Sequence, residues 1–164
     1  MNNKPIRLMK RLAARLALAT VIAACCWACS DTDCTTANTA YVNYAMYGPD
    51  GRNVALTGPV TVTTAGTDSV IINQESNVQL MQLPLRYTST EDTFVVHLSD
   101  ILFDTIFVSH QNIPHFISME CGTGMYFHLN QVRCVRRIFD SIQVVNPEVT
   151  YDSNEHVKIY LPAN

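Results

Sequence analysis

The sequence predicts an all-β protein, a single antiparallel β-sandwich of the Ig-like or transthyretin-like kind. From residue 41 onward, apolar and polar residues alternate with a period of two, the spacing of a strand with one buried face. The alternating segments are rich in Val, Ile, Thr, Tyr and Phe, and Gly, Pro, Asn and Asp separate them. No window shows the apolar stripe of an amphipathic helix, so we expect strands throughout.

The first two strands have the clearest boundaries. Tyr41–Tyr47 runs into a turn cluster at residues 48–51, and Val60–Thr64 follows a Gly-Pro pair and ends at Ala65-Gly66. Short strands divided by regular turns are typical of a sandwich or barrel. The further expected strands are 68–73, 80–87, 93–98, 103–110, 115–119, 125–129, 132–145 and 156–161.

At four positions an Asp, at or near the start of the alternating residues, precedes β-branched or aromatic residues. We interpret this Asp as a side-chain cap on the preceding turn, after which alternate residues point inward. Asp68, Asp104 and Asp140 are 36 residues apart, but the residues between them do not match and Asp92 breaks the period. We therefore do not interpret them as a structural repeat. The shared strand phase predicts a core of Val70, Ile72, Phe94, Val96, Ile106, Val108, Ile142 and Val144.

The N-terminus has the composition of a secretory signal peptide. Its charged residues are all basic, and a mostly apolar run follows from Leu16 to Cys29. That run is shorter than the roughly 20 apolar residues that a membrane-spanning helix needs. We therefore expect residues 1–24 to be removed from the mature chain. The basic residues are Lys4, Arg7, Lys10, Arg11 and Arg15.

The end of the apolar run resembles a bacterial lipobox. Residues 22–25, Ile-Ala-Ala-Cys, place a branched apolar residue, two small residues and a thiol in register. In such a sequence the cysteine sulfur takes a diacylglycerol and the mature chain begins there, which makes Cys25 the expected anchor. Cys29 is the alternative anchor, although the bulky Trp27 precedes it, and cleavage without acylation is a further alternative. Two or three acyl chains, at about 0.8 kcal/mol per buried methylene, make an effectively permanent anchor.

Three segments follow from this interpretation. Residues 1–24 form the lipoprotein signal peptide, residues 25–40 the acylated N-terminus and a small, polar tether, and residues 41–164 the β-sandwich domain. Removing residues 1–24 from 164 leaves 140, which is enough for one domain with a proper core.

Several short motifs are spread over the chain from Cys34 to the C-terminus. They are Asp68-Ser69, Leu83-Pro84-Leu85, His115-Phe116, Cys121-Gly122, Asp140-Ser141-Ile142, Asn146-Pro147 and Ile159-Tyr160. On these motifs and Cys34 the chain resembles a family of small, uncharacterised lipoproteins from Bacteroidetes, catalogued as a domain of unknown function. The resemblance implies location and fold and brings no known activity with it. In that phylum, acidic residues soon after the lipidated cysteine often mark export to the cell surface, and Asp31 and Asp33 lie there.

The charge balance excludes one class of partner. The signal region holds five of the eleven basic residues and none of the fourteen acidic ones, so the mature chain carries six against fourteen, a net charge of −8. This charge disfavours a nucleic-acid partner, and it disfavours anionic lipid surfaces apart from the covalent anchor. Arg133, Arg136 and Arg137 form the only basic cluster. We interpret them as a solvated edge of a strand on which residues 133 and 137 share a face.

Past the signal region there remain Cys34, Cys121 and Cys134, and an exported protein meets an oxidising compartment. Three pairings are open, each of which leaves one thiol over. We expect a Cys34–Cys121 disulfide, because Cys34 precedes the first strand and Cys121 follows the end of a strand. Three free, buried thiols are the alternative.

No catalytic motif stands out, and we predict that the protein is not an enzyme and has no cofactor. Cys121 lies in a glycine-rich loop with His115 and His128 near it in sequence, so a thiol enzyme is the alternative. An oxidised sulfur cannot act as a nucleophile, which argues against it. We also predict no metal site, because His110 and His115 supply one pair without further ligands. Residues 152–155 lack the glycine and distal glutamate of a calcium loop and predict a hairpin turn.

Taken together, these features predict a lipid-anchored envelope lipoprotein, on the cell surface or the periplasmic face of the outer membrane. We expect a non-catalytic binding or structural accessory that has an envelope protein as partner, and the sequence leaves its oligomeric state open. The alternative from another class is a fimbrial subunit or adhesin, in which an edge strand such as Val157–Leu161 is exchanged between subunits.

Overall fold

The computed structural model describes residues 40–67 and 69–163, and every regular element within them is a β-strand. The chain divides into two compact units, residues 1–33 and 34–164, and all described residues belong to the second. The prediction of an all-β protein is confirmed. No helix long and apolar enough to cross a membrane occurs in the described part of the chain.

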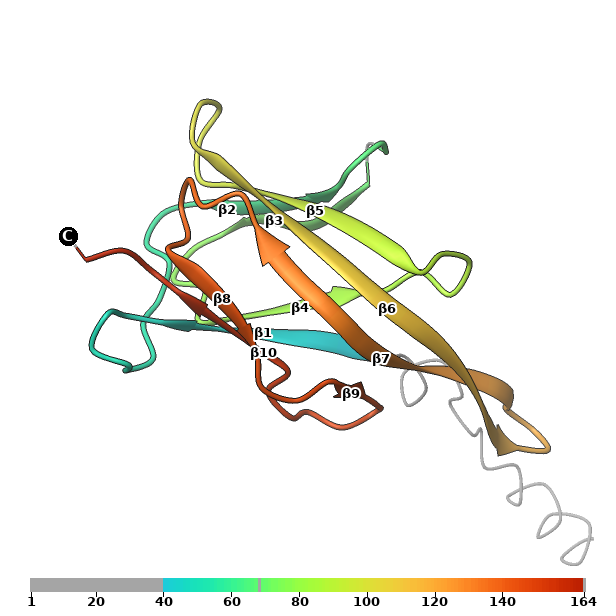
Figure 1. Cartoon of the computed structure of the whole chain (residues 1–164). Coiled ribbons are helices and arrows are strands. Elements are labelled where there is room, and N and C mark those ends of the chain that lie inside the picture. Colours follow the sequence, from blue (N-terminus) through green and yellow to red (C-terminus); the bar gives the residue numbers. More distant parts are fainter. Residues whose placement is uncertain (1–39, 68, 164) are drawn as a thin grey trace, which may run out of the picture. The chain divides into compact units, whose positions relative to one another are not determined.

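The strands form two sheets that pack against each other (Figure 1). Every strand pairing is antiparallel except that of β1 with β10, which is parallel. The larger sheet has the order β3 (Val70–Glu75), β2 (Val60–Thr64), β5 (Glu91–His97), β6 (Phe103–Ser118), β7 (Gly122–Cys134) and β9 (Glu148–Val149). The smaller sheet has the order β4 (Leu80–Pro84), β1 (Tyr41–Tyr47), β10 (Val157–Tyr160) and β8 (Ser141–Val144).

One apolar core lies between the sheets, and it confirms most of the predicted inward positions. Ile72, Phe94, Val96, Ile106 and Val108 are buried, whereas Ile142 and Val144 are half-buried against the same core. The prediction that Val70 points inward is wrong, because this residue is 51% exposed. The register explains the error, since a bulge between β2 and β3 places Ile72 opposite the buried Val62 but Val70 opposite Thr63. A bulge of this kind reverses the face of the residues beyond it.

Strand β6 is longer than predicted. The expected strands 103–110 and 115–119 are one strand of 16 residues, and Pro114 lies inside it. Beyond Ser109, β6 pairs with β7 alone, because β5 begins at Glu91, the partner of Ser109. Pro lacks an N–H donor and is tolerated in a strand whose other edge is open. The proline therefore marks an open edge rather than a break.

The expected strand 132–145 is wrong, because β7 ends at Cys134 and β8 begins at Ser141. The cause is the carboxylate of Asp104, which is fully buried on the core side of β6. It accepts hydrogen bonds from five backbone N–H groups, and Arg136 takes a left-handed φ of 67° within this bend. The donors and their distances are Thr105 at 2.7 Å, Val135 at 3.1 Å, Arg137 at 2.8 Å, Ile138 at 2.9 Å and Phe139 at 3.1 Å.

The C-terminal strand is an inner strand. β10 lies between β1 and β8, and Val157 and Ile159 are fully buried. The expectation that Val157–Leu161 is an edge strand is therefore wrong. The two-residue strand β9 was not predicted, and it pairs with Phe127 and His128 of β7.

Candidate functional site

The most distinctive feature of the domain is a two-stranded arm. We define the arm as residues 111–128, where β6 and β7 continue together past the end of β5 (Figure 1). Directly opposed residues in an antiparallel pair share a face. The register pairs Met125 with Pro114 and Thr123 with Phe116, on the same face as the buried Phe127. The inner face of the arm thus continues the apolar face that forms the core.

A hollow of about 550 Å³ lies along the arm and is lined by arm residues from Thr123 to Phe127. On one side of it are Ala40 and Leu85, which are neighbours because β1 and β4 are paired at Tyr41 and Pro84. The side chain of Tyr87 also lines the hollow and is 70% exposed. The residues of the arm that line it are Thr123, Gly124, Met125 and Phe127. The hollow is therefore a mainly apolar surface that is open to solvent.

Aromatic side chains brace the outer face of the arm. The His115 and Tyr126 rings stack with centroids 4.4 Å apart, and Tyr151 meets Tyr126 edge-on at 4.7 Å. Gly124 is required beneath Tyr151, because a Cβ at this position would collide with the Tyr151 hydroxyl and crowd Ile117. This contact fixes the 150–155 loop against the arm.

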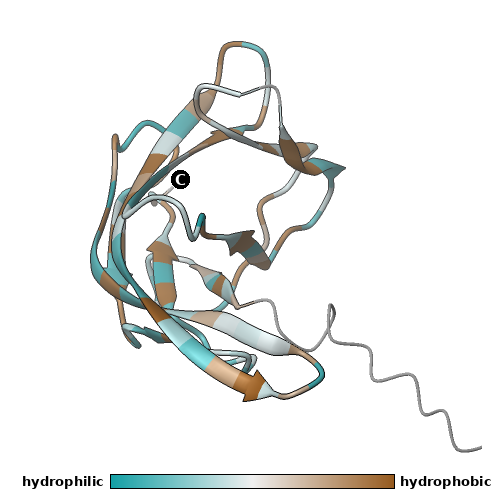
Figure 2. Ribbon diagram, turned by 90° about the vertical axis from the view of Figure 1, so that its right-hand side faces the viewer, coloured by the Kyte–Doolittle hydropathy of each residue, from teal (hydrophilic) through white to brown (hydrophobic). Residues whose placement is uncertain are grey.

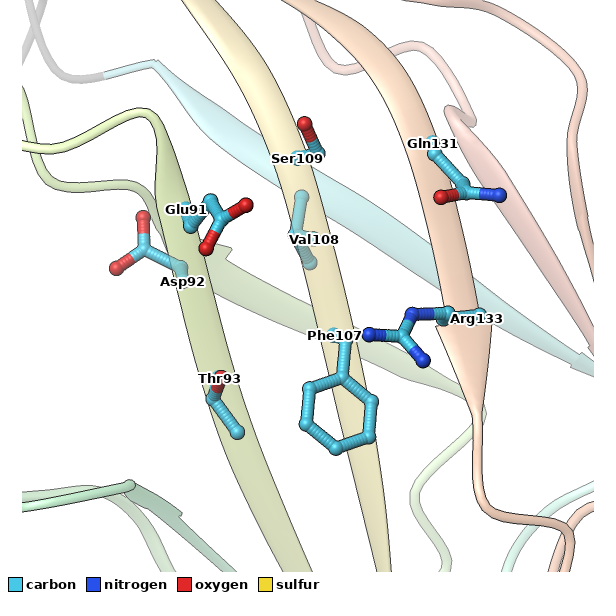
Figure 3. Close-up of a pocket in the computed structure, with 8 residues that line it drawn as sticks. All are labelled: Glu91, Asp92, Thr93, Phe107, Val108, Ser109, Gln131 and Arg133. Atoms are coloured by element: carbon cyan, nitrogen blue, oxygen red, sulfur yellow. The ribbon is translucent and has the colours of Figure 1, made fainter.

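A second concave site lies on the outer face of the larger sheet (Figure 3). It is a pocket of about 150 Å³ that spans β5, β6 and β7, and its ends carry Glu91 and Arg133. The Arg133 guanidinium lies 4.6 Å from the centroid of the Phe107 ring, a cation–π contact. Arg137 makes the same contact with Phe103 at 4.8 Å. Both arginines therefore cover aromatic rings of β6, but Arg137 lies beyond the end of β7, so the predicted single strand does not place it there.

A buried polar network lies on the opposite side of the same strands. The Asp92 carboxylate contacts His110 Nε2 at 3.1 Å and accepts the backbone N–H of Arg86 at 2.9 Å. Arg86 also donates to Asp92 through its side-chain Nε. Burial alone would raise the pKa of Asp92, but the bonds from His110 and Arg86 hold it below its usual value. An Asp–His pair can act as a general base, but both side chains are sealed inside, so they hold the strands together instead.

Tyr44 of the smaller sheet is buried near this network but is not bonded to it. Its hydroxyl and Nδ1 of His110 have no hydrogen-bond partner within the described residues. Burial, and then the negative charge of Asp92, raise the pKa of Tyr44 well above its usual value, so the phenol stays neutral. The network is thus part of the core rather than a site that a ligand can reach.

The structure places the predicted site residues in different parts of the domain. Cys121 lies at the end of the arm, where its N–H donates to Ser118 Oγ at 3.0 Å. Cys134, at the other end of β7, is a free thiol whose pKa is raised by burial and by the charge of Asp104. Cys25, Cys29 and Cys34 lie outside the described residues, so the lipid anchor and the Cys34–Cys121 bridge stay predictions.

The two histidines of the thiol-enzyme alternative have other contacts. His128 is opposite Gln111 in the register and bonds Glu148 at 2.6 Å, whereas His115 is opposite Gly124 and stacks on Tyr126. His128 is seven residues from Cys121 along one strand, about 23 Å, and cannot activate its sulfur. Within residues 40–67 and 69–163, no three His, Cys, Asp or Glu side chains are grouped to hold a metal ion. The predictions of no enzyme and no metal stay predictions.

Residues 152–155 form a polar turn beside the C-terminal strand. The backbone N–H of Asn154 donates to Asp152 Oδ1 at 3.2 Å, and the side-chain amide of Asn154 donates to Asp152 Oδ2 at 2.7 Å. His156 follows, and its Nδ1 accepts the backbone N–H of Asn43 at 3.0 Å. Burial lowers the pKa of His156, although the charge of Asp152 opposes this, so the ring is neutral and suited to accept that bond.

Sequence reasoning missed the buried acids and the arm. The period that places Phe94 and Ile106 in the core also places Asp92 and Asp104 there, two residues earlier. That phase was a sufficient signal for an inward carboxylate. The arm had no comparable signal, because it depends on which strand ends first in the sheet.

The comparisons with known proteins identify a family and no individual relative. No curated protein and no solved structure matches the chain, so the Ig-like or transthyretin-like relationship stays a prediction. The model of the family of unknown function DUF6452 matches residues 59–161, from the start of β2 to the end of β10 and including the whole arm. This match covers more than half of the chain, and the protein therefore belongs to the DUF6452 family.

Proposed function

We propose that this protein is a lipid-anchored lipoprotein of a Bacteroidetes envelope. Its anchor is Cys25 at the outer membrane, and its all-β domain is a non-catalytic binding or structural accessory. The sequence of residues 22–25 supports the anchor, and the acidic mature chain supports a partner other than nucleic acid.

The observation that carries the binding role is the exposed apolar surface of the arm and its hollow. Phe116 is 60% exposed and Met119 is 87% exposed at the end of the arm, and the hollow adds the exposed Tyr87. Phe116 is paired with Thr123, which lines the hollow, and a large exposed apolar patch on a small domain marks an interaction site. Apolar colour reaches the end of the hairpin in Figure 2.

The position of Ala40 and the length of chain between it and Cys34 support the Cys34–Cys121 bridge. Ala40 lines the hollow together with Thr123, which is two residues from Cys121. Cys34 precedes Ala40 by six residues, which span up to about 20 Å. A Cys121–Cys134 pair is excluded, because the two cysteines are separated by about 40 Å of one extended strand and a disulfide needs Cα atoms within about 7 Å. The bridge also leaves no thiolate at Cys121 for catalysis.

Envelope fractionation of serine variants tests the proposal. The wild-type chain should be found in the outer-membrane fraction, Cys25→Ser should lose acylation and membrane retention, and Cys29→Ser should keep both. Loss of retention only in Cys29→Ser would move the anchor to the alternative cysteine. Retention of both variants as for the wild type would overturn the lipid anchor.

Alkylation of the unreduced, unfolded protein tests the non-catalytic role. Cys134 should be modified, whereas Cys34 and Cys121 should be modified only after reduction. Modification of Cys121 before reduction would show that the predicted bridge is absent, and the thiol-enzyme alternative would again be open.

A further inference from the structure

We infer that the end of the arm contacts the acyl layer of the same membrane that holds the lipid anchor. This inference rests on the proposed anchor and names the partner of one exposed surface. We define the arm tip as residues 116–119. It carries Phe116 and Met119, which are 60% and 87% exposed.

The arm is almost free of charge. Glu120 is its only Asp, Glu, Lys or Arg between Gln111 and Phe127, although the mature chain has fourteen acidic residues. Charged groups are costly to bring into an acyl layer, whereas Phe and Met gain free energy by leaving water. Apart from Glu120, which directly follows the tip, the arm is therefore suited to an uncharged lipid surface.

The position of Ala40 directs the anchor toward this end of the domain. Ala40 lines the hollow together with Thr123 and Met125 of the arm. Fifteen residues separate it from Cys25, and a flexible chain of that length has an end-to-end distance of about 20 Å. With the proposed bridge, only nine residues separate Cys25 from Cys34, and the distance falls to about 17 Å. Either length of chain lets the arm reach the lipid.

The chain offers a matched control at the opposite end of β6. Ile101 is 91% exposed in the turn before β6, and the arm tip lies at the far end of this strand. Sixteen residues of strand span about 50 Å. An apolar side chain at position 101 should therefore stay in water while one at position 116 is in the lipid.

Tryptophan fluorescence of the acylated protein in phosphatidylcholine vesicles tests the inference. Trp27 is the only tryptophan of the chain and lies beside the anchor, so it is first replaced by Phe. Phe116→Trp, Met119→Trp and Ile101→Trp are then introduced one at a time, and brominated acyl chains serve as the quencher. Equal thermal melts establish that the variants are folded.

The inference predicts a blue-shifted, quenched emission for Phe116→Trp and Met119→Trp and a water-like, unquenched emission for Ile101→Trp. Equal emission at all three positions, quenched or unquenched, overturns it. An acylated protein with an unquenched arm tip would leave the anchor intact and assign the arm to a protein partner. Recovery of unacylated protein that does not bind the vesicles would refute the anchor, and this inference with it.

Discussion

Replacement of Asp104 by Asn should be among the most damaging single substitutions in this domain. The two carboxylate oxygens accept five backbone N–H bonds, two on Oδ1 and three on Oδ2. Asn has one acceptor oxygen, and its amide group must face either two or three of these donors. At least two bonds are therefore lost, and the others lose the help of the charge.

The size of the loss follows from these bonds. A hydrogen bond to a charged group contributes about 1.5–3 kcal/mol, so the loss of two predicts that Asp104→Asn lowers the free energy of unfolding by about 3–6 kcal/mol. Urea unfolding at pH 7 measures it. Asp100→Asn is the control, because Asp100 is exposed in the turn before β6 and should change stability by less than about 0.5 kcal/mol.

The stability lost in Asp104→Asn should depend on pH. Burial alone would raise the pKa of Asp104, but the N–H groups of Ile138, Phe139 and Arg137 lower it below its usual value near 3.8. The charge therefore contributes stability above pH 4, and this contribution is lost as the pH falls through the lowered pKa. The penalty of Asp104→Asn should shrink in acid. A penalty at pH 7 equal to that of Asp100→Asn would refute the role given to the five bonds.

Three further predictions concern the core, the arm and the C-terminal strand. Ile106→Asn should cost about 3–5 kcal/mol in urea unfolding and Ile71→Asn clearly less, because Ile106 is fully buried and Ile71 half-buried; equal losses would contradict a wet outer face. Gly124→Ala should cost about 1–3 kcal/mol and speed hydrogen exchange in the arm, because its Cβ collides with the tyrosine hydroxyl above it; unchanged exchange would contradict this packing. Because burial lowers the pKa of His156, the stability from its neutral ring should be full above about pH 6.5 and lost as the pH falls through the lowered pKa. His156→Asn, which keeps an acceptor for the Asn43 N–H, should flatten stability between pH 5 and pH 6.5 relative to the wild type, and an unchanged slope would count against this bond.

The strands were predictable because their signals are local. The ranges Tyr41–Tyr47 and Val60–Thr64 coincide with β1 and β2, since a turn sequence limits each of them. The errors arise from contacts between distant residues. Asp104 bends residues 135–139 through bonds across about 30 residues of sequence, and Pro114 fits inside β6 only because β5 has ended.

The candidate site was less predictable than the fold for the same reason. The low charge of the arm can be read from the sequence, but its exposure cannot, because exposure depends on the length of β6 and β7 relative to their neighbours. His115 was recognised as a candidate, but its stacking contact with Tyr126 was not, because strand register decides which side chains meet. Asp92 and His110 are in contact although they are 18 residues apart in the sequence, and no short motif indicates such a pair.

Mass spectrometry of the mature protein from its native envelope tests the central claim most directly. We predict a chain that begins at Cys25, carries two or three acyl chains, and yields an unreduced peptide pair that joins Cys34 to Cys121. A mature chain that begins at an acylated Cys29 would place the anchor at that cysteine, and the protein would still be a lipoprotein. An unacylated N-terminus would contradict the account.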